Sequence, residues 1–134
     1  MNTIDRLRRD HKVLRAKLDV LESALSMGPD AWFVLREVCF TLSRQIRDHM
    51  SREEQLIAAA KNSLDPATLA HVSLEHKDEP RHLRTINKLF VTEQGHTLEH
   101  IRPELTRLIE GFRHHLDEEE AELFPVLERV LGGR

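Results

Sequence analysis

The stretch Asp48-His-Met-Ser-Arg-Glu-Glu-Gln-Leu56 (DHMSREEQL) places a histidine and a glutamate, His49 and Glu53, four residues apart. Side chains with this spacing lie on the same face of a helix, one turn apart. Leu42 and Leu56 continue that face in both directions, so the pattern turns it towards the protein interior. A buried carboxylate is costly without a partner. Either Glu53 is exposed, or a positive group lies beside it in the core.

Two amphipathic helices are predicted in the first half of the chain. The first begins at Ile4 after Thr3, a capping residue, and ends at residues 27–30. Its inner stripe is apolar except at one position, and consists of Ile4, Leu7, His11, Leu14, Leu18, Leu21 and Leu25. The second begins at Pro29 or Asp30 and ends where residues 62–65 break the pattern. Its inner stripe is Leu35, Val38, Leu42, Ile46 or Gln45, His49, Glu53 and Leu56.

Two more helices are predicted in the second half. Asp65-Pro66 is a cap followed by a first turn, and Pro80 predicts a kink or a restart within the third helix. Leu83, Ile86 and Phe90 continue its inner face in phase with His76. After a turn marked by Gly95 and Thr97, the fourth helix begins at Leu98, or near residue 102 because Pro103 disturbs its start. Its inner stripe is Leu98, Ile101, Leu105, Leu108, Phe112, His115, Glu119, Leu123 and Val126, and Gly132-Gly133 closes the chain. Short connections between four helices favour an all-α fold, an up-down-up-down antiparallel four-helix bundle.

The composition narrows the class of protein. With 134 residues, 32% of them charged and 40% hydrophobic, the chain suits one soluble globular domain, residues 1–134. A net charge of −3 and the lack of a basic block argue against a nucleic-acid partner. No run approaches the roughly 20 apolar residues of a membrane helix. The single Cys39 excludes an internal disulfide and is expected to be a small core residue, and we expect a cytoplasmic protein. The sequence does not define an oligomeric state.

A repeat in the sequence links the ligand-type side chains. His49-x-x-x-Glu53 in the first half recurs as His115-x-x-x-Glu119 in the second, and the lone His11 recurs as His76 at nearly the same offset. In an antiparallel bundle these positions share one level, about 12–18 Å from one end. The sequence therefore predicts a metal site in the core, formed by His11, His49, Glu53, His76, His115 and Glu119. A pair of divalent cations would supply the missing counter-charge, and mixed nitrogen and oxygen ligands suit iron or manganese, with zinc possible.

These residues resemble those of the hemerythrin-like family, the HHE cation-binding domain. The matching elements are His11, the run 49–54 (HMSREE), Glu75-His76, and the run 115–120 (HLDEEE) followed by Leu123-Phe124-Pro125. The resemblance implies a four-helix bundle with two iron ions and a bridging oxo or hydroxo group. It implies that Glu53 and Glu119 bridge the irons, and that the four histidines are terminal ligands. It also implies that a diatomic ligand or peroxide binds there: dioxygen, nitric oxide or peroxide.

The chain differs from the oxygen-carrying hemerythrins of this family at several ligand positions. Those proteins have a His-x-x-x-His on the third helix, whereas the positions four before and four after His76 are Val72 and Pro80, which cannot bind metal. The fourth helix offers Glu119 in place of a later aspartate, so the chain looks like the broader HHE group. The missing histidine leaves an open or water-filled position, or a substitute such as His71 or His82. An open position favours reactivity over simple reversible storage.

Several alternatives stay open from the sequence. His114-x-x-x-Glu118 and His96-x-x-x-His100 also have ligand spacing, although their surroundings favour the surface. Glu54, Glu75 and Glu120 either hold imidazole N–H groups of the ligands or belong to solvated helix faces. For function, the alternatives are an iron-sensing or iron-donating protein whose metal loading controls folding or partner binding, a catalase-like peroxide-removing enzyme, and a metal-free structural bundle.

Overall fold

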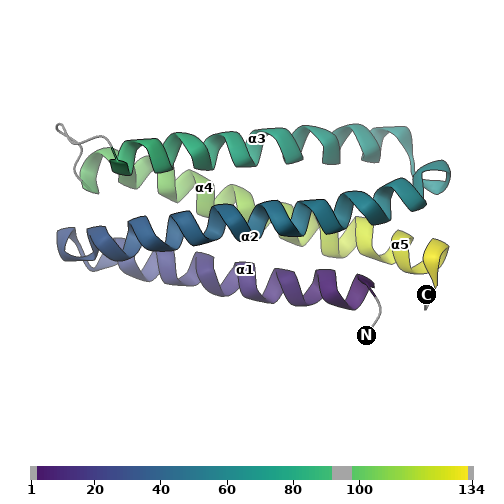
Figure 1. Cartoon of the computed structure of the whole chain (residues 1–134), viewed down its shortest axis with the longest axis horizontal. Helices are drawn as coiled ribbons and strands as arrows, with labels where there is room; N and C mark the ends of the chain where they lie inside the picture. The colour runs from purple at the N-terminus through teal and green to yellow at the C-terminus, as the bar shows by residue number, and fades with distance from the viewer. Residues whose placement is uncertain (1–2, 92–97, 133–134) are drawn as a thin grey trace.

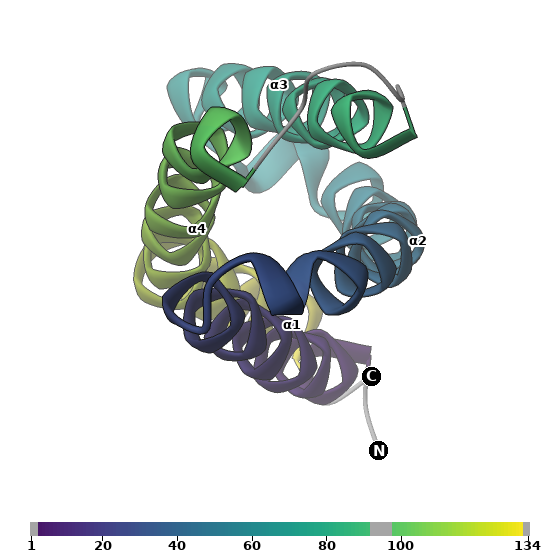
Figure 2. The same ribbon diagram turned by 90° about the vertical axis from the view of Figure 1, so that its left-hand side faces the viewer.

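Four long antiparallel helices form the frame of the protein. A computed structural model describes residues 3–91 and 98–132, with the elements α1 (Thr3–Ser26), η1 (Pro29–Ala31), α2 (Trp32–Ala59), η2 (Lys61–Ser63), α3 (Pro66–Val91), α4 (Leu98–Glu118), η3 (Glu119–Leu123) and α5 (Phe124–Leu131). The helices run side by side along the molecule (Figure 1), and the end view shows each one packed between two neighbours (Figure 2). The predicted up-down-up-down bundle is confirmed, and the described ranges contain no strand. None of their helices is long and apolar enough to cross a bilayer.

The helix ends agree with the sequence pattern in part. Asp65 Oδ1 accepts a hydrogen bond from the Ala67 N–H at 3.3 Å, which confirms the predicted cap of α3. The predicted restart at Pro80 is wrong, because α3 is one helix through this residue. Buried Val72 and Leu83 on either side of Pro80 hold both halves of α3 against the core. α4 includes Pro103, so the later of its two predicted starts is also wrong. The expected turn at Gly95 and Thr97 lies outside the described residues.

The core consists of two apolar clusters with a polar layer between them. The larger cluster extends from Leu14 and Met50 towards the α1–α2 connection, and it includes Cys39, whose burial raises the pKa of the thiol to about 12. The smaller cluster lies at the opposite end and is formed by Ile4, Leu7, Ala60, Leu64, Val72, Leu123, Phe124 and Leu127. Histidine and glutamate side chains fill the layer between the clusters.

The last helix departs from the predicted regular pattern at the polar layer. Residues Glu119–Leu123 form a single π-helical segment, η3, which is wider than an α-helical turn and therefore shifts the register of α5. Phe124 and Leu127 are fully buried, whereas Val126, predicted to face the core, is only partly buried. The shift places the Phe124 ring 4.8 Å from the His11 ring, so one wall of the polar layer is aromatic.

Candidate metal centre

The structure brings the six side chains singled out by the sequence into one layer of the core. They come from all four long helices and from η3: His11, His49, Glu53, His76, His115 and Glu119. Glu53 is 0% exposed and Glu119 is 3% exposed. Their ligand atoms form two groups of four, and in each group all the atoms lie within 4.8 Å of one another. Both groups contain Glu53 and Glu119, and each group could hold a metal ion.

The first group joins α1 and α2. The Nε2 atoms of His11 and His49 lie 3.2 Å apart. His11 Nε2 lies 2.9 Å from Glu119 Oε1, and His49 Nε2 lies 3.0 Å from Glu53 Oε2. Two imidazole nitrogens and one oxygen of each carboxylate therefore surround one point.

The second group joins α3 and α4 and uses the remaining oxygens. His76 Nε2 lies 2.8 Å from Glu53 Oε1, and His115 Nε2 lies 3.0 Å from Glu119 Oε2. Each carboxylate thus directs one oxygen towards each pair of histidines. This is the arrangement in which a carboxylate can bridge two cations.

The carboxylates lack conventional hydrogen bonds at two atoms. Glu53 Oε2 and Glu119 Oε2 are buried and have no hydrogen bond of acceptable geometry, although each lies about 3.0 Å from an imidazole nitrogen. An unsatisfied buried acceptor is costly. Bonds of about 2.1 Å to a metal place neighbouring octahedral ligands about 3.0 Å apart, which matches these separations. These separations are therefore compatible with donor atoms that share a cation.

Every histidine of the layer also has a carboxylate at its second ring nitrogen. The Nδ1 atoms of the four residues lie 3.3, 2.9, 3.0 and 2.7 Å from carboxylate oxygens, in the pairs His11–Glu120, His49–Asp10, His76–Glu54 and His115–Glu75. Such partners fix the ring orientation and leave Nε2 for the metal. Asp10 and Glu54 are hydrogen-bonded to Nδ1 of His49 and His76. Glu120 and Glu75 lie close to Nδ1 of His11 and His115 without hydrogen-bond geometry, so Glu54, Glu75 and Glu120 all contact imidazole nitrogens and are not merely solvated.

Sequence reasoning missed Asp10 as a partner of His49. The signal was present, because Asp10 precedes His11 as Glu75 precedes His76 in the second copy of the repeat. Arg52 holds Asp10 from the other side with two hydrogen bonds, of 3.0 and 2.8 Å. Burial would raise the pKa of Asp10, but the contacts with His49 and Arg52 outweigh it and lower the pKa. Asp10 therefore stays ionised at the imidazole.

Protons supply the counter-charge in the metal-free layer. Burial alone would lower the pKa of His49 and of His115, but their carboxylate partners raise both values to about 11. Burial would likewise raise the pKa of Glu119, yet its contacts with Glu53 and three histidines hold it well below the usual range. Metal must therefore displace protons from the imidazoles.

Glu79 is a further, partly buried acid beside the second group. Its Oε1 lies 3.8 Å from His115 Nδ1. Burial raises the pKa of Glu79 to about 8, against the opposing effect of His115. The corresponding position in the first copy of the repeat is the apolar Leu14. The second group therefore has, beside it, a carboxyl that carries a proton near neutral pH, and the first group has an apolar side chain in that place.

The other histidines that the structure describes lie outside the layer. His114 is 74% exposed and contacts Glu118. His82 Nε2 lies 3.1 Å from Glu104 Oε2, and His71 is 52% exposed beside Glu75 and Glu118, so neither joins the six side chains. His100 is exposed, and His96, its predicted partner, lies outside the described residues.

Comparison with known families gives one match. The family described as Hemerythrin HHE cation binding domain matches residues 2–127, which is nearly the whole chain and includes all six side chains of the layer. No curated protein and no solved structure matched the chain.

Replacing Asp10 with asparagine should weaken metal binding by about 10- to 100-fold, because His49 loses the carboxylate that orients its ring. Titration of the metal-free protein with a divalent cation measures this change. Asp19→Asn is the matched control, since Asp19 is also an α1 aspartate paired with an arginine, Arg113, but lies on the surface. Equal affinity for the two variants would show that Asp10 has no part in the site.

The metal-free protein should lose stability as the pH rises above 6.5. The folded-state pKa values of His49 and His115 are raised from 6.5 to about 11, so protonation stabilises the fold fully below pH 6.5 and progressively less up to about 11. Scanning calorimetry in chelator should show Tm falling between pH 6.5 and about 9. The metal-loaded protein should show a much smaller slope, and identical slopes would contradict the role of protons as counter-charge.

Proposed function

Because the chain belongs to the hemerythrin HHE cation-binding family, we propose that it is a non-haem di-iron protein that binds or reacts with dioxygen, peroxide or nitric oxide. One observation carries the proposal: Glu53 and Glu119 each direct one oxygen to each of two histidine pairs. Two cations in these positions would neutralise both buried carboxylates. Without a counter-charge, each buried carboxylate would cost several kcal/mol, about the size found for other buried ions.

The proposed ligands divide evenly between the two ions. His11 and His49 would hold one iron, and His76 and His115 would hold the other. Glu53 and Glu119 would each bind both irons, and an oxo or hydroxo group would be a further bridge. Nitrogen and oxygen donors in this mixture suit iron or manganese, and zinc is the remaining option. When bound, the iron pair supplies Lewis acidity and one-electron chemistry for a small ligand.

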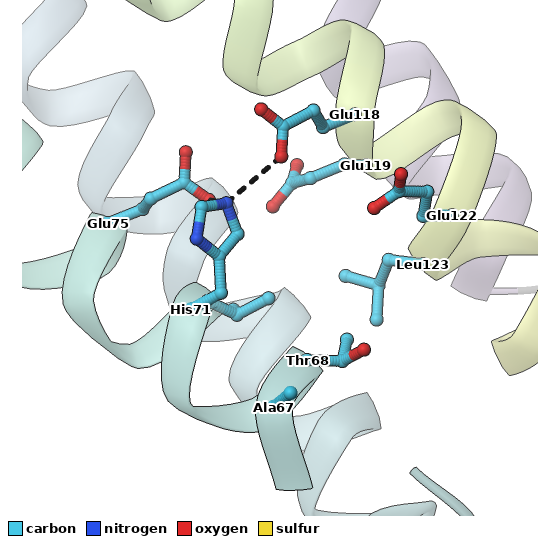
Figure 3. Close-up of a pocket in the computed structure, with 9 residues that line it drawn as sticks. Ala67, Thr68, His71, Glu75, Glu118, Glu119, Glu122 and Leu123 are labelled. Carbon is cyan, nitrogen blue, oxygen red and sulfur yellow. Dashed lines mark hydrogen bonds and ion pairs between the residues drawn. The ribbon is translucent and has the colours of Figure 1, made fainter. Parts of the chain in front are cut away.

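The chain leaves room for such a ligand beside the second group. Four protein atoms would surround each ion, fewer than the six of octahedral coordination. Val72, one turn before His76 on α3, is buried and offers no ligand atom. A cavity of about 190 Å³, lined by residues that include Val72 and Glu119, extends from the surface to this side of the layer (Figure 3). Phe112 and Phe124 pack against His115 and His11 and form apolar walls beside these two rings.

We also propose a domain organisation and a cellular compartment for the protein. A single polar layer between two apolar clusters supports one domain over residues 1–134. One buried cysteine is compatible with a reducing compartment, and on that ground we place the protein in the cytoplasm.

Iron sensing or donation is the second candidate. It is favoured by the complete burial of Glu53, because a cation that binds only to the folded layer couples metal loading to folding. A sensor of this kind would release iron to a moderate chelator and lose helicity as it does so. A ligand-binding di-iron protein would keep its iron under the same treatment.

Iron-loaded protein should contain two iron atoms per chain by elemental analysis. Glu53→Gln should lower iron affinity by about 100-fold or more, because an amide cannot bridge two cations as a carboxylate does. Glu37→Gln, at an exposed glutamate of the same helix, is the matched control and should leave the iron content unchanged. An iron content of zero in the wild type would leave a metal-free structural bundle.

Absorption spectra of the di-ferrous protein, mixed separately with air, nitric oxide and peroxide, test the choice of ligand. A stable, coloured and reversible adduct supports carriage or sensing. Evolution of oxygen from peroxide identifies a catalase-like enzyme. An unchanged spectrum with all three would contradict the proposed reactivity and favour iron sensing or donation.

A further inference from the structure

A second cluster of ligand-type side chains lies outside the core layer, at the surface between α3 and α4. His71 Nε2 lies 3.0 Å from Glu75 Oε1 and 2.9 Å from Glu118 Oε2. The three donor atoms lie within 4.8 Å of one another, and His71 is 52% exposed. An imidazole with two carboxylates is a donor set for a divalent cation such as Fe²⁺. Its exposure and its three ligands favour weak, exchangeable binding.

The cluster opens into the cavity that reaches the core. His71, Glu75 and Glu118 line this cavity together with Glu119 and Glu122 (Figure 3). Glu119 is only 3% exposed, its Oε2 lacks a hydrogen bond, and its carboxylate points into the cavity. A buried, unsatisfied carboxylate at the inner end and a three-ligand cluster at the outer end define a path along which a cation gains ligands.

Glu75 connects the two ends of this path. Its Oε1 faces His71, and its Oε2 lies 2.7 Å from Nδ1 of His115, a proposed ligand of the core. One carboxylate therefore belongs to the surface cluster and also orients a core imidazole. Four glutamates along the cavity, Glu75, Glu118, Glu119 and Glu122, give it a negative potential that concentrates cations.

The sequence repeat shows that the α3–α4 side of the layer differs in its charged residues from the corresponding α1–α2 side. The positions that correspond to His71 and Glu118 in the first half of the chain are Arg6 and Arg52. Asp10 is the counterpart of Glu75, and its carboxylate accepts two hydrogen bonds from the guanidinium of Arg52. In the first half, Arg52 therefore neutralises the carboxylate of Asp10. In the second half, the carboxylates of Glu75 and Glu118 have only the imidazole of His71 between them. Of these two corresponding sides, the α3–α4 side is the one with a cluster of an imidazole and two carboxylates that could hold a cation.

We propose that His71, Glu75 and Glu118 form an uptake site that binds a divalent cation transiently and passes it through the cavity to Glu119 and the core. The inference rests on the proposed function, because it requires the core to bind metal. The ion moves without change of oxidation state. At each step, carboxylate or imidazole ligands replace water, and the protons of the imidazoles leave to solvent.

Cobalt(II), followed by its visible absorption after rapid mixing with metal-free protein, measures the loading rate of the core. His71→Ala and Glu118→Gln should each slow loading at least about tenfold at low ionic strength, the lower limit of electrostatic focusing. The final core spectrum and the two tight cobalt ions should be retained, while a weaker third ion, measured by equilibrium dialysis, is lost. His82→Ala is the matched control, because His82 is an α3 histidine paired with a glutamate away from the cavity, and it should load like the wild type.

Two results would overturn the inference, and they are distinguishable. Unchanged loading rates in both variants, or retention of the third ion, would refute the uptake site while leaving the di-metal core intact. Failure of the wild type to bind two tight cobalt ions would refute the proposed function, and with it the destination that the uptake site needs.

Discussion

Two carboxylates, Glu53 and Glu119, are buried in the core, and the rest of the structure is arranged around their charge. Four imidazoles approach them at 2.8–3.0 Å, and four further carboxylates hold the outer nitrogens of those imidazoles. Removing one member of such a network leaves an uncompensated buried charge, which is more costly than the loss of one contact. The apolar clusters on either side bury most of the layer and so strengthen its electrostatic interactions.

The two halves of the chain surround the buried carboxylates with the same kinds of side chain, but they differ outside the polar layer. Asp10 and Glu75 orient the second histidine of their own hairpins, whereas Glu54 and Glu120 reach across to the lone histidine of the other hairpin. The halves are therefore interlocked through the polar layer. They differ around it: in the first half Arg52 pairs with Asp10, whereas in the second half Glu75 pairs with His71 beside a cavity, and the last helix contains a π-helical segment. π-helical segments often occur at functional sites.

Much of the fold and of the layer could be predicted from helical periodicity. The spacing of four between His49 and Glu53, its repetition at His115 and Glu119, and the echo of His11 at His76 were together sufficient to assign the six side chains to one layer. The π-helical segment was not predictable in this way, because an inserted residue leaves no mark in an apolar pattern that continues with Leu123 and Val126. Asp10 was missed because it is off the inner stripe and acts across to α2. Of the two partners of His71, Glu75 is four residues further along α3 and was overlooked in the sequence, whereas Glu118 is brought close only by the packing of α3 against α4.

Anomalous diffraction at the iron absorption edge, from crystals of the iron-loaded protein, tests most directly whether a cation pair is the counter-charge of the core. Two peaks are expected, about 3.5–4 Å apart, a spacing typical of two-metal sites. One peak should lie within bonding distance of the Nε2 atoms of His11 and His49. The other peak should lie within bonding distance of the Nε2 atoms of His76 and His115. Both peaks should lie within bonding distance of carboxylate oxygens of Glu53 and Glu119. A single peak, or peaks away from these two carboxylates, would contradict the shared cation pair.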